Sequence, residues 1–180
     1  MECMEFRKHT ILAGTTFDVP KYVVRLDSKK THGWQLRYGA WKLFSDFSND
    51  GTGAEESLRL AVEELAKRIA KLPAPTGLRS DAMARKGNDL PVGISGPIIR
   101  HRPGRNSAQY YLQITFPIAG GKPFNTSVYI ATENTLNKEK FDMALAKAIS
   151  LRDSGVRKFK VAATKLKREQ ATTAGLLPAK

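Results

Sequence analysis

The chain has 180 residues and a formal net charge of +13, from 30 lysines and arginines against 17 acidic residues. This charge indicates a polyanionic partner, nucleic acid first and anionic lipid second, although basic residues also serve solubility alone. No apolar run approaches the ~18 residues of a membrane span, so we expect a soluble protein without a membrane partner. The single Cys3 excludes an intramolecular disulfide, and with the absence of a signal-peptide pattern it favours the cytoplasm.

The first half of the chain predicts a leader, a three-stranded sheet and a helix. The leader, residues 1–20, either adds an edge strand or lies across the sheet. Alternating apolar and polar residues predict strands at 21–27, 33–38 and 41–47. The helix is predicted at 55–72, where apolar residues recur at spacings of three and four and form one stripe. The stripe needs an apolar surface to cover, and the preceding strands supply it.

A similar pattern returns after a linker at 73–92, which is either a solvated tether or a segment that orders against phosphates when DNA is present. Strands are predicted at 94–102, 109–116 and 122–131, and a helix at 137–152 that ends at Gly155. Trp34 aligns with Tyr110 and Phe44 with Phe124, and the offset changes only in turns. The expected fold class is therefore α+β, with two tandem units, 21–72 and 93–155, each a three-stranded antiparallel sheet packed on one helix.

The remaining residues, 156–180, form a strongly basic segment whose last part, 170–180, is expected to be disordered. We interpret it either as a solvated tail or as an arm that contacts DNA phosphates. The predicted phosphate contacts are Arg157, Lys158 and Lys160.

Four motifs of the second unit, GISGPIIRHR, QYYLQI, KPFNTSVYI and FDMALAKAISLRDSG, resemble the ethylene-response-factor (Apetala-two) type DNA-binding domain. The resemblance is to its bacterial and phage versions, which are related to the DNA-binding domains of homing endonucleases and integrases. In the first unit, YVVRLD, HGWQLRY, KLFSD and SLRLAVEELAKRI resemble a more divergent member. The resemblance implies a three-stranded sheet on one helix, with the open sheet face set into the DNA major groove.

The resemblance also implies which residues read DNA. In the first unit, Val23 and Val24 stand where the family carries arginines, which weakens the expectation of specific reading there. The implied DNA-binding residues are Arg25, Gln35, Arg37 and Lys42 in the first unit, and Arg100, Arg102, Arg105, Tyr111, Gln113 and Lys122 in the second.

Strand alternation gives the same orientation without reference to a family. If the apolar residues of the central strands, Trp34, Leu36, Tyr110, Leu112 and Ile114, face the helices, their neighbours face outward. Outward arginine, glutamine and tyrosine side chains can contact guanine, adenine and thymine in the major groove, and they can equally be ordinary solvated positions. The outward residues are Gln35, Arg37, Tyr111 and Gln113.

Catalytic patterns are not found in the sequence. His9, His32 and His101 lack metal-ligand spacing, and no glycine-rich phosphate loop is present. We therefore expect a protein that is not an enzyme, with no cofactor, no metal and no small-molecule substrate.

The predicted function is sequence-preferring binding of double-stranded DNA. We expect a transcriptional repressor or other regulator from a bacterium, phage or mobile element, associated with the nucleoid. Two alternatives stay open: a non-catalytic accessory factor in recombination or replication, derived from a homing endonuclease, and a binder of double-stranded RNA. The target sequence and the oligomeric state are not given by the sequence.

Overall fold

A computed structural model describes residues 4–48, 50–79, 89–104 and 107–178. The chain divides into two units, one made of Met1–Pro75 with Ala163–Lys180 and the other of Thr76–Ala162. The described residues form three antiparallel sheets and two α-helices, which confirms the predicted α+β class. Two features depart from the expected pattern of one three-stranded sheet and one helix per unit. An additional hairpin is present, and the boundary between the units falls within the second helix.

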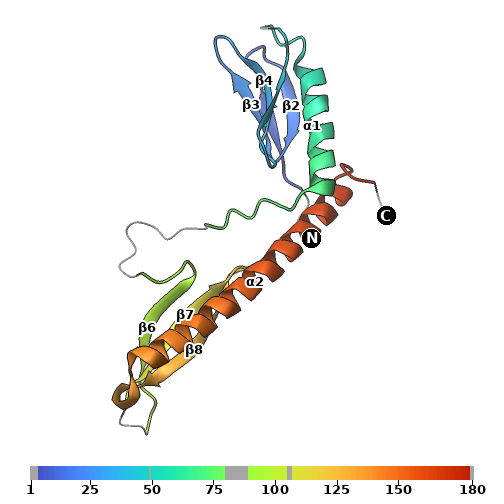
Figure 1. The fold of residues 1–180 in the computed structure, drawn as a ribbon. Coiled ribbons are helices and arrows are strands. Elements are labelled where there is room, and N and C mark those ends of the chain that lie inside the picture. The colour runs from blue at the N-terminus through green and yellow to red at the C-terminus, as the bar shows by residue number, and fades with distance from the viewer. Residues whose placement is uncertain (1–3, 49, 80–88, 105–106, 179–180) are drawn as a thin grey trace. The chain divides into compact units, whose positions relative to one another are not determined.

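The first unit begins with the hairpin of β1 (Phe6–Thr10) and β2 (Thr16–Pro20), so the leader forms a separate two-stranded sheet. Next comes the sheet β3–β4–β5 (Val23–Asp27, His32–Leu36 and Lys42–Ser45), followed by helix α1 (Ala54–Lys71). Figure 1 shows these elements in blue to green. The strands lie within the ranges predicted from alternation, apart from one residue at the start of β4, and α1 matches its predicted range to within one residue.

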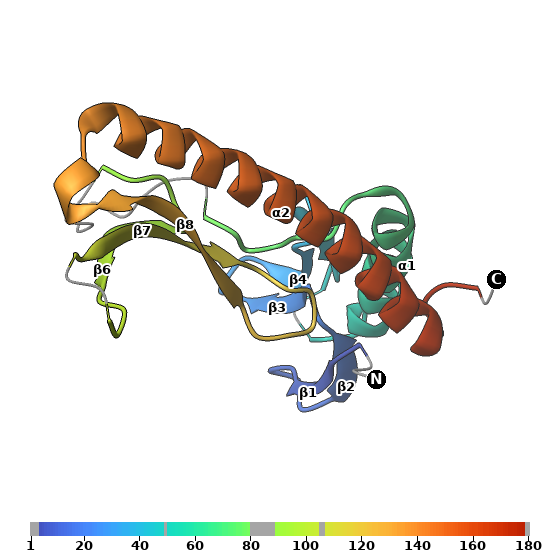
Figure 2. The ribbon, with the colours of Figure 1, turned by 90° about the horizontal axis from the view of Figure 1, so that it is seen from below.

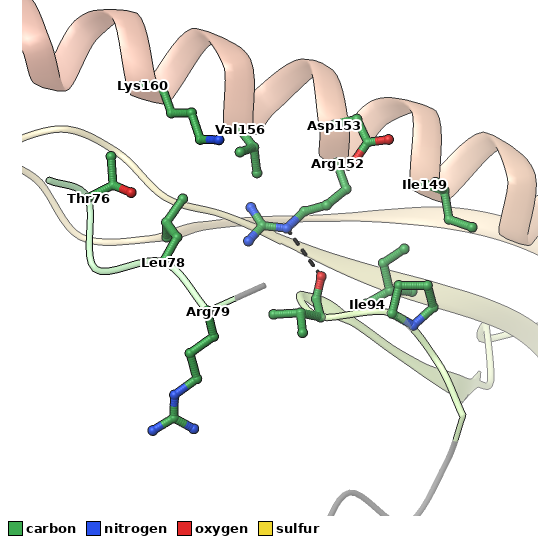
Figure 3. A pocket seen from close by; sticks show the side chains of 11 residues that line it. Thr76, Leu78, Arg79, Ile94, Ile149, Arg152, Asp153, Val156 and Lys160 are labelled. Atoms are coloured by element: carbon green, nitrogen blue, oxygen red, sulfur yellow. Dashed lines mark hydrogen bonds between the residues drawn. The ribbon is translucent and has the colours of Figure 1, made fainter. Parts of the chain in front are cut away.

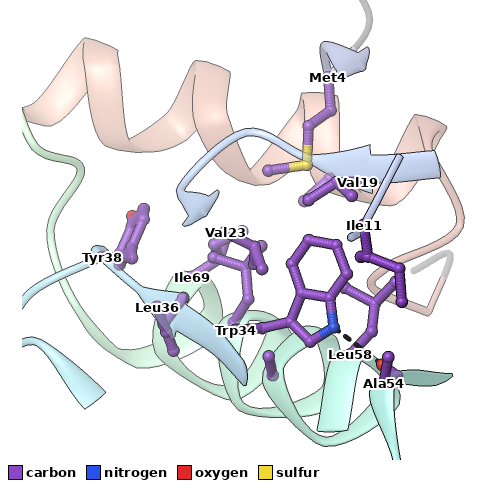
Figure 4. Close-up of a cluster of buried hydrophobic side chains, with 13 residues drawn as sticks. Met4, Ile11, Val19, Val23, Trp34, Leu36, Tyr38, Ala54, Leu58 and Ile69 are labelled. Atoms are coloured by element: carbon purple, nitrogen blue, oxygen red, sulfur yellow. Dashed lines mark hydrogen bonds between the residues drawn. The ribbon is translucent and has the colours of Figure 1, made fainter. Parts of the chain in front are cut away.

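Trp34 lies at the centre of the core of the first unit (Figure 4). Its ring is fully buried, and its Nε1 donates a hydrogen bond of 2.8 Å to the carbonyl oxygen of Ala54, at the start of α1. Phe17, from the leader hairpin, makes an edge-to-face contact with the same ring at 5.8 Å between centroids. The leader therefore belongs to this core. Other buried members are Val19, Val23, Leu36, Tyr38, Leu58, Ala61, Leu65 and Ile69.

The C-terminal segment also packs on the first unit. Helix α2 runs over Lys138–Thr173, and Ala171 is fully buried in the Trp34 core, with Leu176 and Leu177 packed against it. Arg168 Nε donates to the carbonyl oxygen of Ile69 at 3.2 Å. The prediction of disorder over 170–180 is therefore wrong for the described residues, because Ala171, Ala174, Leu176 and Leu177 supply an apolar face that packs in the first core.

The second unit contains the sheet β6–β7–β8 (Ile94–Arg100, Gln109–Phe116 and Phe124–Thr132), the short 3₁₀ helix η1 (Glu133–Thr135) and the first part of α2. Strand β7 has the predicted bounds. Figure 2 shows α2 running along one side of this sheet. Their shared core contains Ile94, Leu112, Ile114, Val128, Ile130, Ala144 and Ala148.

Gly155 does not end the helix, contrary to the prediction from its position after the apolar stripe. A Cβ atom at Gly155 would lie 2.2 Å from Cδ1 of Phe116, so the missing side chain lets this ring approach the helix backbone. Glycine here serves close packing and not helix termination, and α2 continues for another 18 residues.

Candidate nucleic-acid interface

The sheet of the second unit has one buried face and one open face. Leu112 and Ile114 are fully buried on the α2 side, while Tyr111 and Gln113, which alternate with them along β7, are half-buried. This confirms the orientation predicted from alternation. In the neighbouring strand β8, Tyr129 lies opposite Tyr111 and Ser127 lies opposite Gln113. The open face thus combines aromatic rings with hydroxyl and amide groups.

Arg100 lies on this open face with the two tyrosines. Its guanidinium carbon is 4.7 Å from the ring centroid of Tyr111, and its Nη1 donates to Oγ of Ser127 at 3.3 Å. The rings of Tyr111 and Tyr129 meet edge to face at 5.5 Å. The hydroxyl of Tyr111 donates to Oε1 of Gln109 at 2.7 Å, which fixes the ring that supports the guanidinium. A planar donor is therefore held over an aromatic surface.

Tyr129 is not among the residues predicted from the sequence, although its side chain is exposed. The signal was present, because Val128 and Ile130 on either side of it are apolar and buried. Alternation around these two residues would have placed Tyr129 outward.

Two other residues predicted for the second unit, Arg102 and Lys122, lie outside its strands. Arg102 is exposed just after β6, and Lys122 is exposed just before β8. Neither is brought into contact with the Arg100 and Tyr111 pair by any hydrogen bond or ring contact found between described residues. Arg105 lies outside the described residues.

The open face of the first sheet brings together Gln35, Arg37 and Trp41. Arg37 Nε donates to Oε1 of Gln35 at 2.7 Å, and its guanidinium carbon is 5.5 Å from the ring centroid of Trp41. Trp41 is 72% exposed, and Leu43, opposite Gln35, is also exposed. Two of the four residues predicted here therefore lie together on the open face. This face carries more exposed apolar surface than the sequence analysis expected.

Arg25 is not on that face, which corrects the prediction. Its side chain is 3% exposed and forms ion pairs with Asp46 at 2.6 Å and with Asp27 at 2.8 Å. Strand β3 has apolar residues at both alternating positions, and the buried one that fixes its orientation is Val23, two residues before Arg25. Arg25 therefore points with Val23 into the interior.

Lys42 is also misplaced by the prediction. It lies opposite Leu36, which is buried against α1, and its Nζ is 4.9 Å from the ring centroid of Phe44. The pKa of Glu64 in α1 is lowered chiefly by its hydrogen bond from Arg68, and the charge of Lys42 contributes. Lys42 is thus an exposed lysine on the helix side of the sheet.

The residues predicted as tail phosphate contacts, Arg157, Lys158 and Lys160, are exposed on α2 and not on an extended tail. Their positions are therefore set by helix geometry. Arg157 and Lys158 are adjacent, so they point in different directions around the helix.

No helix in the described ranges is long and apolar enough to cross a membrane. Within the same ranges, no group of three or more histidine, cysteine, aspartate or glutamate side chains is placed to hold a metal ion. Comparison of the chain with protein-family models, with curated proteins and with solved structures finds no match.

Proposed function

We propose that this protein binds double-stranded DNA with sequence preference and acts as a transcriptional repressor or another regulator on the nucleoid of a bacterium or in a phage or mobile element. The observation that carries the proposal is the grouping of Arg100, Tyr111 and Gln113 on one open sheet face. Arginine and glutamine form paired hydrogen bonds with guanine and adenine in the major groove, and a two- or three-stranded ribbon fits that groove. The net charge of +13 supplies the general attraction to phosphates.

In this proposal the chain carries two related sheet–helix modules of the ethylene-response-factor type. Two observations support the relation: both three-stranded sheets are antiparallel with strands in consecutive order, and each buries its apolar face in a core with helical residues. We assign base reading mainly to the second module. Of the four reading residues predicted for the first module, only Gln35 and Arg37 lie on its open face, so this module chiefly extends the footprint.

The remaining parts of the proposal concern affinity and chemistry. Arg157 and Lys158 contact phosphates from the helix and add salt-dependent affinity without base preference. Binding needs no cofactor, and the protein is not an enzyme.

The test begins by selecting bound duplexes from a random pool and sequencing them. Binding of the selected duplex and of a scrambled duplex is then measured by fluorescence anisotropy for the wild type, Arg100→Lys and Arg100→Gln. Because Arg100→Lys keeps the charge but loses the planar pair of donors, we expect it to bind scrambled DNA normally. It should lose about 5- to 100-fold of its discrimination. Lys147→Gln, an exposed change on α2, is the matched control and should discriminate normally.

Unchanged discrimination in both Arg100 variants would refute the assignment of this face. Competition with an RNA duplex of the selected sequence provides the second arm. Binding of RNA as tight as that of DNA would replace the proposal with recognition of double-stranded RNA.

A further inference from the structure

The second unit holds a cavity of about 310 Å³ that the proposed function does not use. It lies among the start of β6, the middle of α2 and the loop residues 76–79, as Figure 3 shows. Its walls are largely apolar, with Leu78, Val92, Ile94 and Val156 among them. Ile94 is buried in the core shared with α2, so the cavity is on the helix side of the sheet.

A guanidinium group lies in the middle of this apolar cavity (Figure 3). Arg152 Nε donates to the carbonyl oxygen of Val92 over a long 3.5 Å, and Nη1 is buried without a hydrogen-bond partner among the described residues. Burial lowers the pKa of Arg152, and the nearby charge of Asp153 only partly opposes this. A buried charged donor without an acceptor is costly. Among the described residues this nitrogen therefore has no acceptor, and an anion would supply one.

The backbone makes room for this guanidinium. Gly93 has φ +83°, and a Cβ atom there would lie 2.2 Å from Nε of Arg152. Any other residue at this position would push the guanidinium out of its place. The clearance is therefore a built feature of the turn that precedes β6.

The charges around the cavity favour an anion. Lys160 lines the cavity eight residues after Arg152, which is slightly more than two helical turns, so both side chains leave α2 on similar sides. Figure 3 shows the side chain of Lys160 turned toward the cavity, while the carboxylate of Asp153 and the guanidinium of Arg79 point away from Arg152. Two cations thus face the cavity, and the carboxylate of Asp153, which also belongs to the lining, points away from the guanidinium.

We infer that this cavity binds a small organic anion, a carboxylate or phosphate that carries a compact apolar group. Arg152 pairs with the anion, the positive charge of Lys160 adds to the attraction, and the apolar group contacts Val92, Ile94 and Val156. The volume lies at the lower end of the range for small-molecule sites. The cavity and the face of Tyr111 and Gln113 lie on opposite sides of the same sheet. The inference therefore stands independently of DNA binding.

The test titrates the full chain with phenyl phosphate, benzoate, inorganic phosphate and phenol, and follows the NMR signals of the Gly93 amide and the Arg152 Nε–H. We expect phenyl phosphate or benzoate to bind more tightly than inorganic phosphate does, and we expect no binding of phenol. Comparison of phenyl phosphate with benzoate identifies the preferred anion. Loss of the charge-assisted hydrogen bonds in Arg152→Met should weaken binding about tenfold or more. Lys147→Gln, outside the cavity, should leave affinity unchanged.

A second variant covers the possibility that Arg152→Met unfolds the unit, because Arg152 also braces Val92. Lys160→Gln keeps that contact and should weaken binding severalfold. The wild-type melting temperature should rise with phenyl phosphate or benzoate, since a ligand of the folded state stabilises it. The inference is overturned if neither anion shifts the Gly93 and Arg152 signals, or if Lys160→Gln and Lys147→Gln reduce affinity equally. Equal loss would indicate diffuse attraction to surface lysines.

Discussion

Replacement of Arg25 by methionine should strongly destabilise the first unit, because it leaves a buried carboxylate without its cation. The side chain of Asp46 is 0% exposed and accepts hydrogen bonds from Nη2 of Arg25 at 2.6 Å and from Oγ of Ser57 at 2.5 Å. Removing one partner of a buried ion pair costs about 3–5 kcal/mol. Loss of the stacking of Arg25 on Trp34, at 5.0 Å, adds to this cost. We therefore expect a loss of at least about 3 kcal/mol.

Urea unfolding followed by tryptophan fluorescence measures this loss selectively. The two tryptophans, Trp34 and Trp41, both belong to the first unit, so the signal does not report the second. With an m-value of about 1–3 kcal/mol/M, the midpoint should fall by about 1 M or more. The double variant Arg25→Met with Asp46→Leu removes both charges and should recover much of the loss, because apolar replacements of buried pairs are tolerated.

A loss below about 1 kcal/mol in the single variant would refute the reasoning, since such values are typical of solvent-exposed pairs. The same variant also tests the corrected position of Arg25. While it remains folded, its discrimination between selected and scrambled DNA should equal that of the wild type. A drop in discrimination with unchanged stability would indicate that Arg25 lies on the open face of the first sheet and contacts DNA.

Three further outcomes are expected. Burial alone would raise the pKa of Asp27, but hydrogen bonds with Arg25 and His32 outweigh it and lower the pKa. The stabilisation from Asp27 is therefore complete above about pH 4 and is lost as the pH falls through the folded-state pKa. The free energy of unfolding, followed by tryptophan fluorescence, should therefore fall more steeply with decreasing pH in the wild type than in Asp27→Asn. Gly155→Ala should lower the melting temperature of the second unit, because the clash with Phe116 costs about 1–3 kcal/mol and exceeds the gain in helix propensity. If the clash is the cause, adding Gly155→Ala to a Phe116→Ala variant should not lower the melting temperature further. Removal of residues 170–180 should lower the stability measured by tryptophan fluorescence, whereas an unchanged urea midpoint would show that the buried Ala171 contributes little.

The sequence predicted best the elements whose pattern is local. The predicted bounds of β7 match the structure because apolar and polar residues alternate strictly from Gln109 to Phe116. Helix α1 was predicted to within one residue because its stripe is continuous. These patterns also oriented Tyr111 and Gln113 correctly.

The errors concern residues whose environment depends on distant partners. Strand β3 reads Val-Val-Arg-Leu-Asp, so alternation does not choose its buried face, and the pairing of Arg25 with Asp46 joins residues 21 positions apart. Gly155 has the appearance of a helix stop, and only the ring of Phe116 from a different strand shows that it serves packing. The cavity at Arg152 could not be predicted for the same reason, because its walls come from three separate segments of the chain.

The packing of the C-terminal segment on the Trp34 core has a consequence for synthesis on the ribosome. The second unit is continuous in sequence, so all of its residues are available once Ala162 has emerged. The core of the first unit is incomplete until Ala171, Leu176 and Leu177 have also been synthesised. At about 5–20 residues per second, the roughly 100 residues made after α1 delay its completion by about 5–20 s. The unit translated first is therefore expected to finish folding last, with Trp34 incompletely covered during that interval.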